Sequence, residues 1–259
     1  MRNIRLTVEY DGSSFRGWAA QPGLRTVSGH LTKALGELTG AEVKLIAASR
    51  TDSGVHAEGQ VVNFRTGSRI PLERLKLAVN RKLSPDIMVR GIEEVKEGFS
   101  SRDNKGKLYS YTIALGDDVP SRVKRFAWQV TWDLDVSAMR RAAKTLIGRH
   151  DFSSFAVTDK RRVLKDPVRH VRSIRIKSSS LRELFGSLSG GSRAKAIKLE
   201  FLGDSFLYKM IRSIVGTLVE VGRGGRRAED MEKILAAASR GEAGRTAPPE
   251  GLTLIKVIF

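Results

Sequence analysis

Residues 49–64 of the chain are SRTDSGVHAEGQVVNF. The first half of this stretch is polar and contains a glycine, which is typical of a loop, and the second half has the apolar residues of a strand. Asp52 lies in the loop half, between an arginine and a glycine turn. An aspartate followed by Ser-Gly usually forms part of a turn. The stretch by itself therefore leaves two interpretations of Asp52, a turn residue or a reactive carboxylate.

The chain around this stretch is strongly basic. Its 259 residues include 46 Lys and Arg against 28 Asp and Glu, which gives a formal net charge of +18 at pH 7. Such an excess attracts polyanions, so nucleic acid is the expected partner. A basic surface that serves only solubility is the alternative. There is no cysteine, which excludes disulfides, thiolate nucleophiles and zinc sites with Cys ligands.

The N-terminal sequence MRNIRLTVEY alternates apolar and polar residues. This period is typical of a strand and not of a signal peptide. No apolar run approaches the length of about 18 residues that a membrane span needs. We therefore expect a soluble, cytoplasmic protein.

Helical and strand patterns are interspersed in both halves of the chain. In the first half, Ser28 is the expected N-cap of a helix whose apolar residues share one face, and Gly40 follows its end. Pro71 is expected to open a second helix, which Ser84 and Pro85 close. The expected strands cover residues 43–48 and 87–95.

In the second half, strands are expected over 107–115, 126–132, 168–178, 195–202 and 252–259, and helices over 139–146, 206–222 and 228–239. Residues 182–193, rich in Ser and Gly, are expected to form a flexible loop. Polar residues 96–106 suit a junction. We predict an α+β fold with two similar halves, residues 1–104 and 105–259, around a mixed, mostly antiparallel sheet with a central cleft.

Several common catalytic motifs are missing. His56 follows Asp52 by four residues, but no third ligand lies nearby, so a metal site is not expected. The chain has no nucleophile elbow and no GxxxxGK[ST] phosphate loop. Residues 222–225, Gly-Arg-Gly-Gly, are most simply a helix stop, although their amides could also contact a phosphate.

The segment SRTDSGVHAEGQV resembles the signature loop of the TruA family of tRNA pseudouridine synthases, over thirteen consecutive positions. The resemblance extends in order through nearly the whole chain, in EYDGSSFRGWAAQPGLRTVSG, NRKLSPDIMV, GKLYSYTI, GRHDFSSF, SFLYKMIRSIVGTLVEVGRG and AGRTAPPEGLTLIKV. Three places depart from the family pattern: His30, Ser84 and a shortened segment after Phe99. They affect expected RNA contacts and not the reaction.

The resemblance implies the ferredoxin-like pseudouridine synthase fold and the isomerisation of uridine to pseudouridine at positions 38–40 in the anticodon arm of tRNA. Uracil is detached at N1, rotated and rejoined through C5, so no cofactor and no metal are needed. The resemblance assigns catalysis to Asp52. An aspartate is ordinarily ionised at neutral pH, and a neighbouring guanidinium favours the anion. The sequence leaves open whether it attacks C6 of the base, adds at C1′ or removes a proton from C2′.

The resemblance also implies substrate-binding residues. Arg50 would fill the space that the flipped uridine leaves, a task that suits the planar guanidinium; an ordinary phosphate contact is the alternative. Tyr109 would stack on the uracil. Because Tyr111 lies on the same strand face, one or both tyrosines could instead belong to the core.

Two further residues carry roles in this resemblance. Arg212 would form a salt bridge to Asp52, or else belong to a solvated stripe of its helix. Leu252 would pack against the edge of the base, or else belong to the core. The family also works as homodimers.

A dense basic segment suggests a strip that follows the tRNA backbone. Its members are Lys160, Arg161, Arg162 and Lys165, followed by Arg169, Arg172, Arg175 and Lys177. Two other functions stay open. One is a non-catalytic RNA-binding or chaperone protein on the same fold, and the other is a nuclease that holds a metal with Asp52 and His56.

Overall fold

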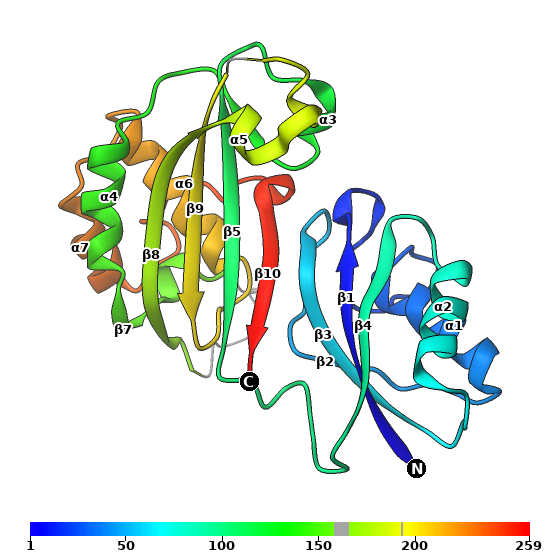
Figure 1. Ribbon diagram of the computed structural model, residues 1–259. Coiled ribbons are helices and arrows are strands. Elements are labelled where there is room, and N and C mark those ends of the chain that lie inside the picture. The colour runs from blue at the N-terminus through cyan, green and yellow to red at the C-terminus, as the bar shows by residue number, and fades with distance from the viewer. Residues whose placement is uncertain (158–165, 193) are drawn as a thin grey trace. The chain divides into compact units, whose positions relative to one another are not determined.

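The computed structural model describes residues 1–157, 166–192 and 194–259. It is an α+β protein, as predicted, and it divides into two compact units (Figure 1). The first unit comprises Met1–Lys105 and Thr253–Phe259, and the second comprises Gly106–Leu252. The predicted halves placed residues 253–259 in the second half. By compactness these residues group with the first unit, where Thr253 and Leu254 pair in parallel with His56 and Ala57.

The sheet of the first unit is built around β1 (Arg2–Tyr10). This strand pairs antiparallel with β3 (His56–Thr66) and with β4 (Ile87–Val95). Its alternate residues Ile4, Leu6, Val8 and Tyr10 are buried, as the apolar period predicts. β2 (Ile46–Ala47) pairs antiparallel with β3 and is shorter than the strand expected over 43–48, while β10 (Leu252–Ile258) pairs with β3 in parallel.

Two helices of the first unit, α1 (Val27–Thr39) and α2 (Leu72–Lys82), lie side by side (Figure 1). Pro71 precedes α2 as expected, and Gly40 ends α1 in the left-handed conformation, with φ of 69°. The expected N-cap of α1 was wrong. Thr26 caps the helix, since its Oγ1 accepts a hydrogen bond from the Gly29 amide, whereas Ser28 lies buried inside the first turn.

In the sheet of the second unit, successive neighbours are β5 (Gly106–Leu115), β9 (Lys195–Gly203), β8 (Val168–Ser180) and β7 (Gly148–Asp151), each antiparallel to the next. β6 (Trp128–Val130) pairs in parallel with the end of β5. One face of the sheet is apolar because buried side chains of β5 lie opposite buried side chains of β9: Tyr109 opposite Phe201, Tyr111 opposite Leu199, and Ile113 opposite Ile197.

The longer helices of the second unit are α4 (Val136–Thr145), α6 (Met210–Gly222) and α7 (Asp230–Ala237), with α4 packed on β8 and α6. The unit also has the short helices α3 (Ser121–Lys124) and α5 (Leu181–Phe185). Single 3-10 turns complete the described chain: η1 (Gly12–Ser14) in the first unit, and η2 (Ser153–Phe155), η3 (Gly186–Ser189) and η4 (Pro249–Gly251) in the second.

Two expectations for the second unit were wrong. Residues 182–193 are not simply a loop, because Ser180 and Glu183 form a capping box that starts α5, and Leu181 is fully buried beside it. The helix expected over 206–222 begins only at Met210, because Lys209 has a left-handed backbone, with φ of 59°. In the described part of the chain, none of the helices combines the length and the apolar character that crossing a membrane requires.

Candidate active site

The loop between β2 and β3 carries Asp52 and is fixed through its backbone. The amide of Trp18 donates to the carbonyl of Thr51 at 3.0 Å, and the hydroxyls of Tyr10 and Thr51 are 2.7 Å apart. The Val55 amide donates to the main-chain carbonyl of Asp52 at 3.2 Å, which closes the Asp-Ser-Gly turn. Because a backbone group closes the turn, the turn interpretation and the catalytic interpretation of Asp52 are compatible.

Residues 10–18, which we call the clamp segment, hold this loop from the other side. The Phe15 carbonyl accepts hydrogen bonds from the Gly54 amide at 3.3 Å and from the Ser53 hydroxyl at 3.2 Å. Gly17 has φ of +90°, and a Cβ there would lie 2.9 Å from the Thr51 carbonyl oxygen and 3.2 Å from the carbonyl carbon of Asp52. A Cβ on Gly12 would lie 2.0 Å from the Val55 carbonyl oxygen. Only glycine lets the two backbones approach this closely.

His56 anchors the end of the loop and is almost fully buried. Its Nδ1 lies 3.0 Å from the Gly12 amide, which donates to it, and 3.3 Å from Oδ1 of Asp11. One nitrogen cannot accept from Gly12 and donate to Asp11 at the same time. We assign it as the acceptor, because the Gly12 contact is the shorter one. The sequence suggested only a metal ligand for His56; its partners lie 44 and 45 residues earlier in the chain, which no local pattern shows.

Asp11 is a half-buried acid beside the loop. Burial raises the pKa of its carboxyl, but hydrogen bonds outweigh this effect and hold the pKa well below its usual range. The Ser13 amide donates to Oδ1 at 2.9 Å, and the neighbouring His56 side chain also lowers the pKa of Asp11. Within the described residues, no group of three His, Cys, Asp or Glu side chains is arranged to hold a metal ion.

The two tyrosines of β5 lie on one face of the second unit but differ in their surroundings. Tyr111 is fully buried, its hydroxyl donates to the Pro248 carbonyl at 2.7 Å, and a Cβ on Gly251 would lie 2.6 Å from its ring. Burial raises the pKa of Tyr111 well above its usual value. Tyr109 retains 6% exposure and meets Phe206 edge to face, with ring centres 5.5 Å apart. Tyr111 is therefore a core residue, and Tyr109, which is also buried, is the more exposed of the two.

Arg212 lies in the first turn of α6 and is half-buried. Its Nε donates to the Ala247 carbonyl at 2.8 Å, and the Ala247 amide donates back to the Arg212 carbonyl at 3.0 Å. Arg212 and Tyr111 thus both hold residues 247–251, which lead directly to Leu252. Leu252 is 7% exposed at the start of β10. The expected salt bridge of Arg212 to Asp52 joins residues of different units and stays a prediction.

Comparison with known proteins shows the family of the chain. A family model described as tRNA pseudouridine synthase matches residues 6–102 and 142–259. The chain belongs to this family. It is 40% identical to tRNA pseudouridine synthase A of Acetivibrio thermocellus and 39% identical to tRNA pseudouridine synthase A 2 of Clostridium perfringens, over the full length of both chains in each case. The relative from Brevibacillus brevis is 38% identical over the same extent. As a tRNA pseudouridine synthase, the protein is an isomerase that converts uridine to pseudouridine in tRNA.

The predicted basic strip of this synthase is only partly described. Lys160, Arg161, Arg162 and Lys165 lie outside the described residues. In the described part, Arg169 donates to the carbonyls of Asp166 and Val168, and Arg172 forms an ion pair with Asp204. Arg175 and Lys177 are exposed on β8. The tRNA-binding role of the strip stays a prediction.

Residues 222–225 of the synthase are a helix stop, as the simpler interpretation predicted. The Arg223 amide donates to the Val219 carbonyl at 3.0 Å, the Gly224 amide to Val221 at 3.0 Å, and the Gly225 amide to Glu220 at 2.9 Å. Because these amides already donate to the end of α6, they do not form an anion-binding nest.

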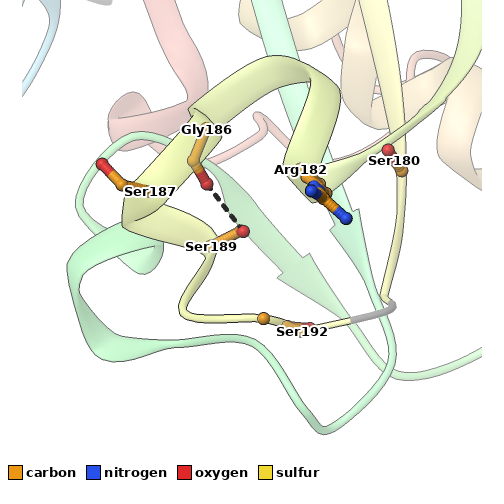
Figure 2. A pocket seen from close by; sticks show the side chains of 7 residues that line it. Ser180, Arg182, Gly186, Ser187, Ser189 and Ser192 are labelled. Atoms are coloured by element: carbon orange, nitrogen blue, oxygen red, sulfur yellow. Dashed lines mark hydrogen bonds between the residues drawn. The ribbon is translucent and has the colours of Figure 1, made fainter.

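A pocket lined by serines and glycines lies at α5 and η3 (Figure 2). Its hydroxyls serve the local backbone, since Ser189 donates to the Gly186 carbonyl at 2.7 Å and Ser192 donates to the Asp118 carbonyl at 2.7 Å (Figure 2 shows the first of these). Ser180 caps α5. Arg182 is the one charged residue among the described residues that line this pocket. These contacts give the serines a structural role.

Proposed function

We propose that Asp52 is the catalytic carboxylate of this tRNA pseudouridine synthase and that the enzyme acts on uridines 38–40 of the anticodon arm. The observation that carries the proposal is the fixed loop. The backbones of Thr51 and Gly54 are bound by the clamp segment, while the side chain of Asp52 stays half-exposed. A reactive group held on a rigid backbone is what efficient catalysis requires.

The chemistry balances without a second substrate. The bond between C1′ and N1 breaks, a bond between C1′ and C5 forms, and the proton that C5 loses is replaced by one gained at N1, so no net electrons are transferred. Asp52 would act at C6, at C1′ or at the C2′ proton. Each of these roles needs an ionised carboxylate, and each is compatible with the partial exposure of Asp52.

The other family residues receive the roles that the resemblance implies. Arg50, exposed in the same loop, would take the place of the flipped uridine. Tyr109, the more exposed of the two tyrosines, would stack on the uracil. Arg212 would act through the Asp52 carboxylate, and Leu252 would pack against the base. We further propose a homodimer that acts in the cytoplasm.

The test is product analysis of an unmodified tRNA transcript treated with wild type, Asp52→Asn or Asp52→Ala, without added metal. Pseudouridine is mapped by carbodiimide treatment and primer extension. We expect wild type to modify the anticodon arm, and both variants to lose about a thousandfold or more in rate while their tRNA Kd changes less than about threefold. Asp103→Asn, which removes an exposed acid of the first unit, is the matched control and should keep full activity.

Two outcomes would contradict the proposal. If Asp52→Asn keeps its rate, another group carries the reaction. If wild type binds tRNA tightly but isomerises nothing, the alternative of a non-catalytic RNA-binding protein takes its place. Strand scission that depends on a divalent cation would instead indicate a nuclease.

A further inference from the structure

We propose that a pocket in the first unit, beside Arg50, binds one nucleotide of the tRNA strand next to the target uridine. This inference rests on the proposed function and adds a subsite to it. The pocket has a volume of about 600 Å³, within the range of small-molecule sites. Its larger apolar lining residues, which we call the floor, are Trp18, Val43 and Leu45, and its cations, which we call the rim, are Lys44, Arg50 and Arg102. Ser28 and Thr32 also line it and add two hydroxyl groups.

The charge of the rim points to an anionic ligand. No acidic residue is among the described residues that line the pocket. Lys44, Arg50 and Arg102 are all exposed, and within the described chain their charged groups make no hydrogen bond and no ion pair. By contrast, Arg172 is paired with Asp204, and Arg226 with Glu220. Three uncompensated cations around one hollow favour a phosphate group, which guanidinium groups bind in forked geometry.

The floor of the pocket suits the remainder of a nucleotide. Trp18 and Val43 are each only 4% exposed, so packing in the core holds their side chains in place. Ala19, Ala20 and Ala47 also line the hollow, and their small side chains leave room above it. A ribose or base over an apolar floor, with its phosphate at a basic rim, is the common arrangement for single-stranded RNA.

The position of the pocket identifies the nucleotide. Arg50 is two residues from Asp52, so chain geometry limits their Cα separation to about 7 Å. Trp18 lies in the floor, and its amide also donates to Thr51 in the Asp52 loop at 3.0 Å. The pocket and the Asp52 loop are therefore one connected piece. A strand whose target uridine lies at Asp52 would place a neighbouring nucleotide here.

Charge removal tests the pocket without touching the proposed catalytic residues. The double variant Lys44→Ala/Arg102→Ala leaves Arg50 in place. The control, Arg74→Ala/Arg81→Ala, removes two exposed cations of α2 that do not line the pocket. We expect the pocket variant to raise the tRNA Kd about tenfold at 0.1 M KCl, and to reduce the slope of log Kd against log salt by about 1 to 2. The control should raise the Kd less than about threefold.

Cross-linking tests the place of the nucleotide. Because the chain has no cysteine, Lys44→Cys can carry a single thiol-specific photo-cross-linker, with Arg74→Cys as the control. Primer extension on the cross-linked tRNA should stop within two nucleotides of the uridine that wild type modifies. Cross-links spread over the tRNA, or equal effects of the two double variants on Kd, would overturn the proposal.

The failure of this inference can be told apart from failure of the proposed function. The Kd, the salt slope and the cross-link require binding only. If the pocket variant behaves as expected while wild type forms no pseudouridine, the pocket stands as an RNA site and the catalytic proposal fails. If polyglutamate competes for the labelled pocket and a single-stranded oligoribonucleotide does not, the pocket binds an acidic protein segment and the proposal is wrong.

Discussion

Tyr109 and Tyr111 are two residues apart on one strand face, and their surroundings assign them different tasks. The hydroxyl of Tyr111 is bound to Pro248, and its ring packs against Gly251, so its loss affects the fold. Tyr109 meets Phe206 edge to face and, at 6% exposure, is the more exposed of the two rings. A ring that stacks on uracil needs its aromatic face more than its hydroxyl.

We therefore expect Tyr109→Phe to keep the single-turnover rate within about threefold of wild type and Tyr109→Leu to lower it about 10- to 100-fold, as the loss of one base–aromatic stack would. Single-turnover assays on excess enzyme measure this rate. Tyr111→Phe serves as the contrast: it should lower the free energy of unfolding by about 1 to 2 kcal/mol, because the half-buried Pro248 carbonyl loses its donor. If Tyr109→Phe were as slow as Tyr109→Leu, the hydroxyl and not stacking would matter.

Asp11 gives the fold a defined dependence on pH. Its pKa is lower in the folded protein than in the unfolded chain, so its contribution to stability is present above about pH 4 and is lost as the pH falls towards the folded-state pKa. Asp11→Asn should be less stable than wild type at pH 6 and should lose less stability between pH 6 and pH 3. Urea unfolding at both values measures this. Asp103→Asn should follow wild type, and an equal acid loss in Asp11→Asn would contradict the assignment.

For single residues, the sequence singled out Asp52 as the candidate catalytic residue, but it did not predict the contacts that hold the Asp52 loop. The string around Asp52 is contiguous, so its resemblance to a family could be detected. The contacts of His56 with Asp11 and Gly12 join residues more than 40 positions apart. Only the pairing of β1 with β3, which sets Tyr10 opposite Ala57, brings them together.

Among the structural elements, the clamp segment is the one that holds the Asp52 loop in place. Two of its glycines, Gly12 and Gly17, lie where a Cβ would enter the backbone of residues 51–55. Gly23, which lies outside the clamp segment, also has a left-handed backbone, with φ of +70°, but nothing lies within 4 Å of the position where a Cβ would be. Gly17 and Gly23 therefore form a matched pair that differs mainly in contact with the loop.

We expect Gly17→Ala to lower the free energy of unfolding by about 1 to 2 kcal/mol more than Gly23→Ala, since both are strained but only the first meets the loop backbone. A displaced Asp52 should also lower kcat about a hundredfold in Gly17→Ala and leave kcat of Gly23→Ala within about twofold of wild type. Thermal unfolding and single-turnover rates check both effects. Equal kcat values for the two variants would show that the clamp does not position Asp52.

Helices and strands with a clear period of apolar residues were predicted from the sequence. The positions where helices begin depend on contacts with other segments or on side-chain caps, and these were not predicted. The helix after Pro71 and the strand over 87–95 match α2 and β4. Thr26 and Ser28 are both residue types that favour the N-cap position. The helix starts after Thr26 because the Val27 amide donates to the Gly17 carbonyl of the clamp segment, a contact that the local sequence does not show. The composition of residues 182–193 predicted a flexible loop, but the capping box of Ser180 and Glu183 starts α5 at Leu181, and this helix continues to Phe185.

At the scale of the whole molecule, the net charge of +18 and the proposed catalytic residue Asp52 would have separate roles. Lys and Arg gather the tRNA, and counterions released from its phosphates make the affinity depend on salt. The isomerisation itself changes no net charge, and in the proposed mechanism it engages one aspartate, Asp52. The division of labour predicts that salt affects binding and not the chemical step.

We therefore expect log Kd for tRNA to rise linearly with log salt between 50 and 200 mM KCl, with a Kd about 100-fold or more higher at the upper end if at least five or six phosphates are contacted. The single-turnover rate at saturating enzyme should change less than about twofold over the same range, because the bound complex holds the target uridine independently of free counterions. Filter binding and rapid quench measure the two quantities on one tRNA. If the single-turnover rate at saturating enzyme falls with salt as steeply as the affinity, the Lys and Arg side chains take part in the chemical step. Their main contribution would then be to position the uridine and not to capture the tRNA.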